Sequence, residues 1–317
     1  MSDRTQSRRS FLAGAGLAAG AMLAGIGPVG AAEETARHGG LHLASNQYPW
    51  LVFYRRENRN FGELPDMGIE AVAAGDIDGF EPIITEPQQI DQFAPLLKKH
   101  GLEMRSLYVN SLLHEPDEAA KSIDQVLAIA EKAKTIGTRI IVTNPSPIRW
   151  GGPENKNDAQ LRVQARAINK LGAGLKSLGL TLSYHNHDIE LRNAAREFHH
   201  MMVGTDPSLV TLCLDAHWIY RGAGNSSVAL FDVLRLYGPR VTELHLRQSI
   251  DGIWTETLCD GDIDYRAIAK HLLAIGLKPH LVLEQAVETG TPKKLDAVEA
   301  HRQSCRYAAD VFAGMAG

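Results

Sequence analysis

Cysteines and surplus positive charge are both scarce in this sequence of 317 residues. Its three cysteines, Cys213, Cys259 and Cys305, form an odd and widely spaced set, which argues against a disulfide framework. Lysine and arginine number 33 against 37 aspartates and glutamates, giving a formal net charge of -4. Because such a chain has no basic excess to neutralise a phosphate backbone, we expect no nucleic-acid partner.

A glycine-rich phosphate loop is absent where a nucleotide-binding sheet would carry one. The first predicted strand, 41–45, runs into Ser45-Asn46-Gln47-Tyr48-Pro49-Trp50, which contains no glycine. An open, doubly wound sheet normally has such a loop after its first strand, so this architecture is disfavoured. Beyond residue 26 there is also no apolar run of membrane-spanning length, so we expect no membrane span in the mature protein.

The first 32 residues carry the pattern of a twin-arginine export signal. Arg8 and Arg9 precede an apolar run at 13–26 that is rich in glycine and alanine, and the small residues Ala31 and Ala32 follow. A membrane anchor would need about 20 strongly apolar residues, and this run is shorter. We therefore predict a signal at residues 1–32 and a mature protein, 33–317, in the periplasm or outside the cell.

Short β-rich runs alternate with longer helical segments in the rest of the chain. Apolar residues in the helical segments recur every three or four positions, as in Ile168, Leu171 and Leu175. Gly101 and Gly179 each fall just before a predicted strand, where a glycine that ends a helix is expected. The predicted strands cover eight segments: 41–45, 79–84, 104–109, 139–143, 181–185, 210–215, 241–246 and 281–284.

Eight such alternating units predict an α/β fold, a closed (βα)8 TIM barrel in a single domain. A hydrophobic content of 44% and the length of the mature chain suit one barrel of this kind. The carboxyl ends of all its strands open onto one mouth, where residues far apart in sequence can share a ligand. The polar loop 144–157 is expected at the same end, either as a rim of the mouth or as a plain surface loop.

Polar side chains stand at the ends of the last four predicted strands. His185 and His245 lie in the fifth and seventh strands, and Asp215 and Glu284 follow buried apolar runs in the sixth and eighth. A carboxylate so placed is costly unless a metal or another cation compensates it. Two imidazoles and two carboxylates suit one divalent metal, Mn²⁺, Co²⁺, Fe²⁺ or Zn²⁺, with Mg²⁺ as a further option. Each residue taken singly could instead cap a loop or a helix.

Five short motifs stand in order along the second half of the chain: Tyr184-His185-Asn186-His187-Asp188, Leu214-Asp215-Ala216-His217, Leu244-His245-Leu246-Arg247, Asp260-Gly261-Asp262-Ile263-Asp264 and Leu283-Glu284-Gln285. Together they resemble the sugar phosphate isomerase/epimerase family of xylose isomerase-like TIM barrels. The resemblance implies one metal held from strands five to eight, here by His185, Asp215, His245 and Glu284. Many relatives have a glutamate at the first of these places, so His185 is a departure, and His187 is a competing candidate.

The resemblance also implies proton abstraction next to a carbonyl group that the metal polarises. Symmetric epimerisation needs two opposed carboxylates, and only Glu284 is evident as a base here. One-base isomerisation or β-elimination therefore fits better than two-base epimerisation. His187 and His217 are predicted to act as acids or to orient the substrate.

Three further residues are candidates for binding the substrate. Glu81 could bind a substrate hydroxyl or pair with Arg247, and a purely structural salt bridge is an equal alternative. Arg247 could itself fix a carboxylate, phosphate or keto oxygen. Trp218 could form an apolar wall for a sugar face, with packing in the core as the alternative.

These observations predict a metal-dependent isomerase, epimerase or lyase that acts on a sugar, keto sugar or cyclitol. One alternative is a non-catalytic periplasmic barrel that binds sugar or activates a partner protein, which the missing glutamate at position 185 keeps open. A remote alternative is a phosphodiesterase similar to apurinic endonucleases, which the net charge disfavours. The sequence leaves a homo-oligomer open.

Overall fold

Eight parallel strands form the centre of the molecule. The computed structural model describes residues 38–316, so the predicted export signal at residues 1–32 lies outside the described residues. The strands pair side by side in the order β2-β1-β10-β7-β6-β5-β4-β3. Their bounds are β1 Leu43–Asn46, β2 Gly79–Glu81, β3 Ser106–Ser111, β4 Ile140–Pro145, β5 Thr181–His185, β6 Thr211–Asp215, β7 Val241–Leu246 and β10 His280–Leu283. All eight predicted strands are present, with ends shifted by a few residues.

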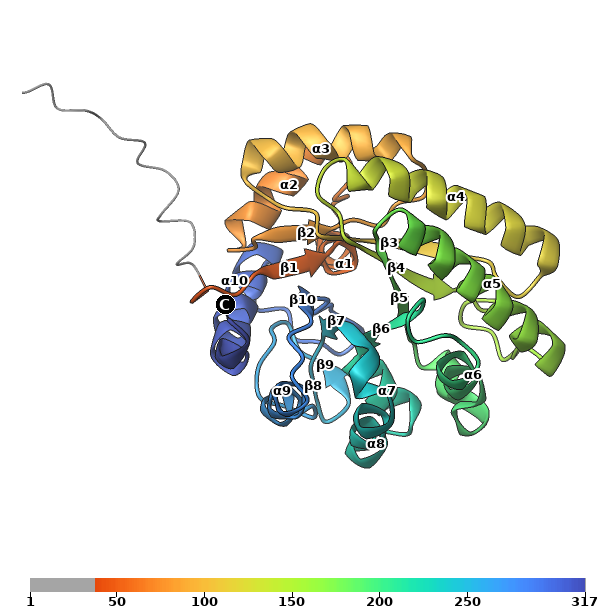
Figure 1. Ribbon diagram of the computed structural model, residues 1–317. Coiled ribbons are helices and arrows are strands. Elements are labelled where there is room, and N and C mark those ends of the chain that lie inside the picture. Colours follow the sequence, from red (N-terminus) through yellow and green to blue (C-terminus); the bar gives the residue numbers. More distant parts are fainter. Residues whose placement is uncertain (1–37, 317) are drawn as a thin grey trace, which may run out of the picture.

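Two isolated parallel bridges join the outer strands β2 and β3. Gly79 pairs with Glu103, which lies just before β3, and Ile83 pairs with Tyr108 of β3. Regular pairing stops at Pro82 between them, because proline has no amide hydrogen to donate. The sheet is thus a nearly closed barrel surrounded by helices (Figure 1), which confirms the predicted TIM barrel.

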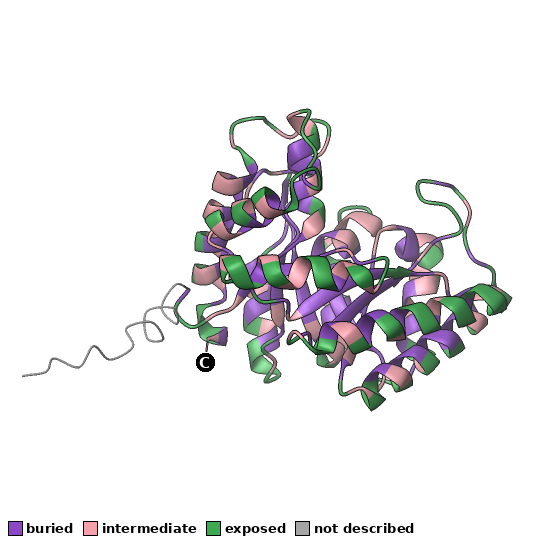
Figure 2. Ribbon diagram, turned by 90° about the horizontal axis from the view of Figure 1, so that it is seen from above, coloured by how far each residue is buried: buried purple, intermediate pink, exposed green. Residues whose placement is uncertain are grey.

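Amphipathic helices cover the outside of the barrel. In α5, Asn157 and Gln160 form a reciprocal capping box, and the predicted apolar positions, Ile168, Leu171 and Leu175, are all buried. Figure 2 shows the same division over the whole molecule, with buried strands inside and exposed helix faces outside. The helices are α1 Gln47–Arg56, α2 Pro65–Ala74, α3 Gln88–His100, α4 Pro116–Lys134, α5 Asp158–Ser177, α6 Arg192–Val203, α7 Ala216–Gly222, α8 Ser227–Tyr237, α9 Tyr265–Ala274 and α10 Ala297–Val311.

A short antiparallel hairpin, β8 Ser249–Ile250 and β9 Ile253–Trp254, follows β7 and was not predicted. Its turn residues Asp251 and Gly252 both have positive φ, of 52° and 78°. An Asp-Gly pair is a recognised hairpin signal, and the two strands are too short for alternation to show them in the sequence. The hairpin matters because it carries Ser249 and Trp254 to the mouth of the barrel.

The apolar core lies mainly between the strands and the helices that cover them. A smaller cluster of Tyr108, Val142 and Cys213 lies apart from it. Cys213 is fully buried, as expected for a small core residue. Over residues 38–316, none of the helices combines the length and the apolar character that a bilayer crossing requires.

Candidate metal centre and active site

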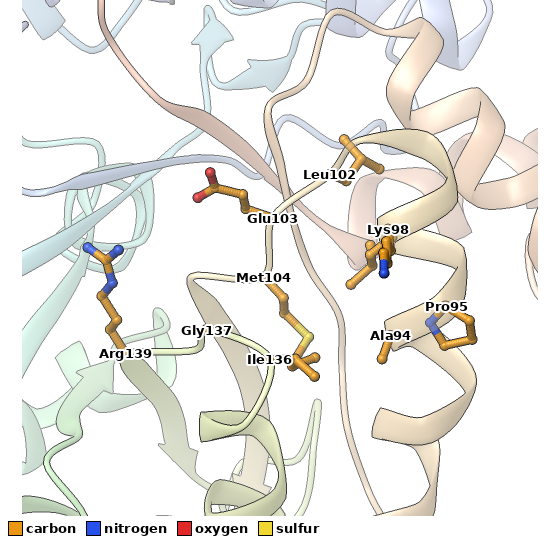
Figure 3. A pocket seen from close by; sticks show the side chains of 10 residues that line it. Ala94, Pro95, Lys98, Leu102, Glu103, Met104, Ile136, Gly137 and Arg139 are labelled. Atoms are coloured by element: carbon orange, nitrogen blue, oxygen red, sulfur yellow. The ribbon is translucent and has the colours of Figure 1, made fainter. Parts of the chain in front are cut away.

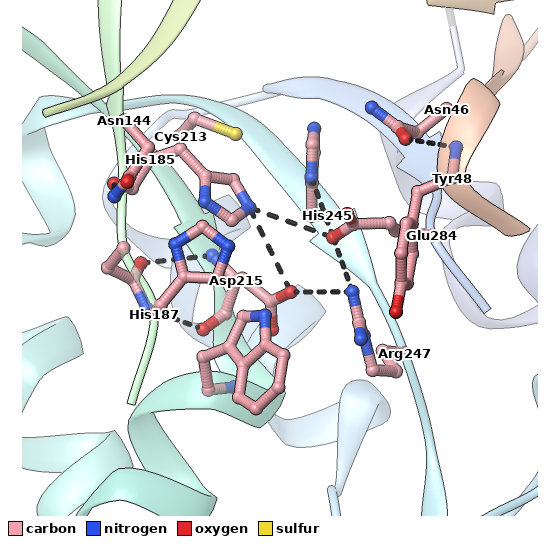
Figure 4. Close-up of polar contacts among 12 residues, drawn as sticks. Asn46, Tyr48, Asn144, His185, His187, Cys213, Asp215, His245, Arg247 and Glu284 are labelled. Atoms are coloured by element: carbon pink, nitrogen blue, oxygen red, sulfur yellow. Dashed lines mark hydrogen bonds and ion pairs between the residues drawn. The ribbon is translucent and has the colours of Figure 1, made fainter. Parts of the chain in front are cut away.

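The four side chains predicted as metal ligands converge at the mouth of the barrel (Figure 4). His185 and Asp215 end β5 and β6, His245 lies in β7, and Glu284 follows β10 directly. One ligand atom from each lies within 4.8 Å of the others. All four are buried. The parallel strands therefore bring together residues that span a hundred positions of the sequence.

Several polar atoms of this group have no hydrogen-bond partner among the described residues. They are both ring nitrogens of His185 and Oδ2 of Asp215. The Nε2 atom of His185 lies 3.6 Å from Oε2 of Glu284 and 4.0 Å from Oδ2 of Asp215, too far for hydrogen bonds. Buried polar atoms without partners are costly. Two nitrogen and two oxygen donors around one point would hold a divalent metal, which would satisfy Asp215 Oδ2 and one ring nitrogen of His185, so the residues fit the predicted group.

Arg247 lies beside this group, and its guanidinium is also buried. Its Nη2 atom lies 2.7 Å from Oε2 of Glu284 and 3.6 Å from Oδ2 of Asp215. The guanidinium carbon stands 4.3 Å from the ring centre of Trp254 and 4.9 Å from that of Trp218. The Nε and Nη1 atoms have no partner among the described residues. Arg247 thus supplies positive charge to the carboxylates and keeps two donor groups available.

The two carboxylates have opposite pKa shifts. Burial would raise the pKa of Glu284, but Arg247 and His245 beside it hold that pKa well below its usual range. Burial raises the pKa of Asp215 to about 7, with Arg247 opposing the shift and Glu284 adding to it. Glu284 is therefore ionised at neutral pH, which is the form that a proton acceptor needs.

The far side of the His245 ring faces a second pair of carboxylates inside the barrel. Its Nδ1 atom lies 3.1 Å from Oε2 of Glu284, whereas its Nε2 atom lies 3.1 Å from Glu81 and 3.0 Å from Glu243. Glu81 also accepts hydrogen bonds from Asn46, at 2.7 Å, and from Ser106, at 2.6 Å. Such outer carboxylates fix the orientation of a ligand histidine.

One of the alternatives for Glu81, an ion pair with Arg247, is wrong. Within residues 38–316, the ion pairs of Arg247 are with Asp215 and Glu284, and that of Glu81 is with His245. The carboxylate of Glu81, at the end of β2, is fully buried and lies 3.1 Å from the Nε2 atom of His245. The binding of a substrate hydroxyl by Glu81 stays a prediction, which its complete burial disfavours.

His187 and His217 lie around the group and not in it. Among the described residues, two of the three clusters able to hold a metal include His185, and none includes His187 or His217. The ring of His187 lies 4.7 Å from that of His185, and His217 shares a hydrogen bond of 3.0 Å with Ser249 of the hairpin. Burial lowers the pKa of both, with His185 adding to the effect at His187 and Arg247 at His217, which falls to about 2. At neutral pH both imidazoles are uncharged, which favours orienting a substrate over acid catalysis.

Three polar residues that hold the loop after β5 were not predicted. The Asn186 side chain bonds both the backbone carbonyl and the backbone amide of Asp215, at 3.1 and 3.2 Å. Glu190 accepts from the amide of His187, at 2.7 Å, and from Asn144, at 3.0 Å. Their positions depend on which strands are neighbours, so no signal in the local sequence distinguishes them. Glu243 was also missed, although its spacing of two from His245 places both on one face of β7.

A groove of about 660 Å³ lies at the opposite end of the barrel (Figure 3). Its lining includes Glu103 and Met104 before β3, Arg139 before β4, and Leu97 and Lys98 at the end of α3. These positions precede their strands, whereas the histidine and carboxylate group follows its strands. The groove is therefore separate from the candidate active site.

Comparisons with known proteins agree with this architecture. A family model described as a xylose isomerase-like TIM barrel matches residues 63–309. The chain is 25% identical over 277 residues to an inosose dehydratase of Clostridium perfringens, a match that covers 76% of this chain and 91% of that one.

Two solved structures are similar in fold. A 3-keto-D-glucoside 4-epimerase from E. coli superposes with a TM-score of 0.59 at 13% identity, covering 87% of this chain and 98% of that chain. A xylose isomerase-like TIM barrel protein from Mycobacterium smegmatis, solved in complex with magnesium, gives a TM-score of 0.66 at 14% identity, with coverage of 88% and 99%. The likeness extends over almost the whole of both solved chains.

Proposed function

The chain belongs to the xylose isomerase-like TIM barrel family, and from this premise we propose that it is a metal-dependent isomerase, epimerase or lyase acting on a keto sugar or cyclitol. The observation that carries the proposal is the convergence of His185, Asp215, His245 and Glu284 with unpartnered buried donor atoms. The inosose dehydratase relative and the keto-glucoside epimerase neighbour support this substrate class.

His185, Asp215, His245 and Glu284 would hold the metal. When bound, a divalent metal supplies a positive centre that polarises a substrate carbonyl and lowers the cost of removing the neighbouring proton. Mn²⁺, Fe²⁺, Co²⁺ and Zn²⁺ suit the mixed nitrogen and oxygen donors best, and the magnesium complex of a neighbour supports keeping Mg²⁺ as an option. The rigid support of His245 by Glu81 and Glu243 would keep its ring in place.

Glu284 would remove the substrate proton, because its carboxylate is ionised at neutral pH. Arg247 would direct its free Nε and Nη1 donors to a substrate oxygen, while its Nη2 group orients Glu284. With one evident base, the same carboxylate would return the proton to the neighbouring carbon, which gives isomerisation, or would pass it to a β-hydroxyl group, which would then leave as water. We therefore favour isomerisation or elimination over two-base epimerisation.

The other mouth residues would shape the pocket. His187 and His217, both uncharged, would donate or accept hydrogen bonds to hydroxyl groups. Trp218 and Trp254 meet edge to face at 5.5 Å, and neither indole nitrogen has a partner among the described residues. They would form the apolar wall with polar edges that a sugar ring needs.

A second candidate function is a sugar-binding barrel without turnover. The observation that favours it is the contact of Arg247 with Glu284, because a built-in cation compensates these carboxylates without a metal. The two functions differ in one property that is directly measurable. The enzyme requires a stoichiometric divalent metal, and the binder does not.

The test is deuterium exchange from heavy water into a panel of inososes, keto sugars and 3-keto glycosides, using mature protein loaded with each metal in turn. Deuterium at the carbon next to the carbonyl, lost on chelation and restored by metal, would support the enzyme. Saturable sugar binding without bound metal, exchange or turnover would overturn it in favour of the binder.

We also propose that residues 1–32 direct export through the twin-arginine pathway. Replacing Arg8 and Arg9 by lysine should leave the protein in the cytoplasmic fraction. Periplasmic protein at an unchanged level in that variant would contradict this proposal.

A further inference from the structure

The loop between β4 and α5 places an exposed tryptophan at the mouth. Trp150 is 53% exposed, yet its ring lies 5.0 Å from that of His187 in an edge-to-face contact. His187 in turn lies 4.7 Å from His185 of the proposed metal group. The three rings therefore form a row from the candidate metal site to the rim of the mouth. The loop between β4 and α5 is thus part of that rim and not a plain surface loop.

Hydrogen bonds fix this loop on both sides of Trp150. Arg192 donates to the carbonyl of Gly152 at 2.8 Å, and Arg149 pairs with Glu154 at 2.7 Å. Farther along, the buried ammonium of Lys156 donates to the carbonyl of Pro145 at 3.0 Å. The large ring of Trp150 is therefore exposed on a loop that these contacts hold in place.

The charges near Trp150 indicate what it binds. Arg149 is engaged by Glu154, and Arg192 donates to a backbone carbonyl, so the charged groups of the loop already have partners. A phosphate group would need available cationic donors. The ring face of Trp150 instead suits a flat, uncharged ring, which packs against an indole through its C–H groups or its π-face.

We propose that Trp150 is the binding platform for a second ring of the substrate. The substrate class is then a glycoside, in which a keto sugar lies at the metal group and the ring linked to it rests on Trp150. This inference rests on the proposed function, because it takes the metal group as the reacting centre. The His187 ring lies 4.7 Å from the His185 ring and 5.0 Å from the Trp150 ring, so it stands between the reacting centre and the rim.

The experiment uses three probes that share one reacting ring: methyl 3-keto-β-D-glucopyranoside, its phenyl counterpart and 3-keto-cellobiose. We expect Trp150→Ala to lower the ratio of kcat/KM for the two-ring probes over the methyl probe by about tenfold, the effect of losing one good aromatic contact. Ile148→Ala, at another exposed apolar residue of the same loop, should leave the ratio unchanged. The phenyl and cellobiose arms distinguish an aromatic group from a second sugar.

Binding without chemistry separates this inference from the proposed function. Tryptophan fluorescence of the full chain would be titrated with cellobiose and with phenyl and methyl β-D-glucopyranoside. If no probe exchanges deuterium but the two-ring ligands bind more tightly than the methyl glucoside, and only Trp150→Ala removes the difference, the function fails and the platform stands. If wild-type protein turns over all probes and Trp150→Ala leaves the ratio unchanged, the platform is overturned and the function stands. A protein that neither binds nor exchanges any probe would overturn both.

Discussion

Each end of the barrel holds a close pair of buried or half-buried histidines. Only the pair at the mouth belongs to a cluster of described residues that could hold a metal. At the mouth, the rings of His185 and His245 lie 4.8 Å apart. At the amino-terminal end of the strands, the rings of His42 and His280 lie 5.3 Å apart. Both pairs include ring nitrogens without a partner among the described residues. Histidine content therefore does not distinguish the two ends.

Carboxylates make the difference between them. At the mouth, Asp215 and Glu284 are buried and face the imidazoles. At the other end, the acidic neighbour of His42 is Glu103, which is 56% exposed and pairs with Arg105. No cluster able to hold a metal includes His42 or His280 among the residues the structure describes. Converging buried acids, and not paired histidines, therefore distinguish the end that carries the candidate site.

The largest expected difference between the ends concerns proton abstraction. Glu284→Gln removes the proposed base and one ligand while keeping the size of the side chain, so deuterium exchange should fall by about 10³-fold. Glu103→Gln makes the same change at the opposite end, and its exchange rate should match that of the unaltered protein. Equal losses in the two variants would remove the proposed distinction, and thermal melts would show whether both variants are folded.

A smaller effect is expected from the support beneath His245. Burial and the adjacent Glu81 raise the pKa of Glu243, whereas His245 lowers the pKa of Glu81 against the effect of burial. Both carboxylates contact the Nε2 atom of the His245 ring. Glu243→Gln should weaken metal affinity by about 10- to 100-fold, as loss of an outer partner typically does. Competition with a fluorescent chelator would measure this, with His280→Gln as the control. Unchanged affinity in Glu243→Gln would show that the ring needs no such support.

The smallest effect concerns stability in acid at the amino-terminal end. Burial, with help from His42, lowers the pKa of His280 from 6.5 to about 3. The unfolded chain therefore takes up a proton as the pH falls below 6.5, whereas the folded protein does not, and stability is lost on acidification. Between pH 7 and pH 5, the free energy of unfolding should therefore fall by about 2 kcal/mol less in His280→Gln than in the unaltered protein. Urea unfolding at the two pH values would check this, and the same acid loss in variant and parent would refute it.

The sequence predicted the fold and the four proposed ligands more fully than the support around them. Apolar runs locate strands such as β6, and a polar residue after such a run must lie at the mouth once the fold is a barrel. Glu243 and Asn186 were missed because their roles depend on strand neighbours. The sheet pairs Cys213 with Glu243 after a register shift at Leu212, which local sequence does not reveal. An ion pair of Glu81 with Arg247 was one of the open alternatives, and the local sequence does not reveal that this carboxylate contacts His245 instead.

Glu81 also has a consequence for how the barrel is closed. Its hydrogen bond to Ser106 crosses from β2 to β3, where the strands are joined only by isolated bridges among the described pairings. Its other oxygen touches the His245 ring and Asn46 of β1. One carboxylate thus contacts both the irregular pairing of β2 with β3 and the ring of the candidate ligand His245. Replacing Glu81 would therefore remove a contact between β2 and β3 and a contact to the candidate ligand His245 at the same time.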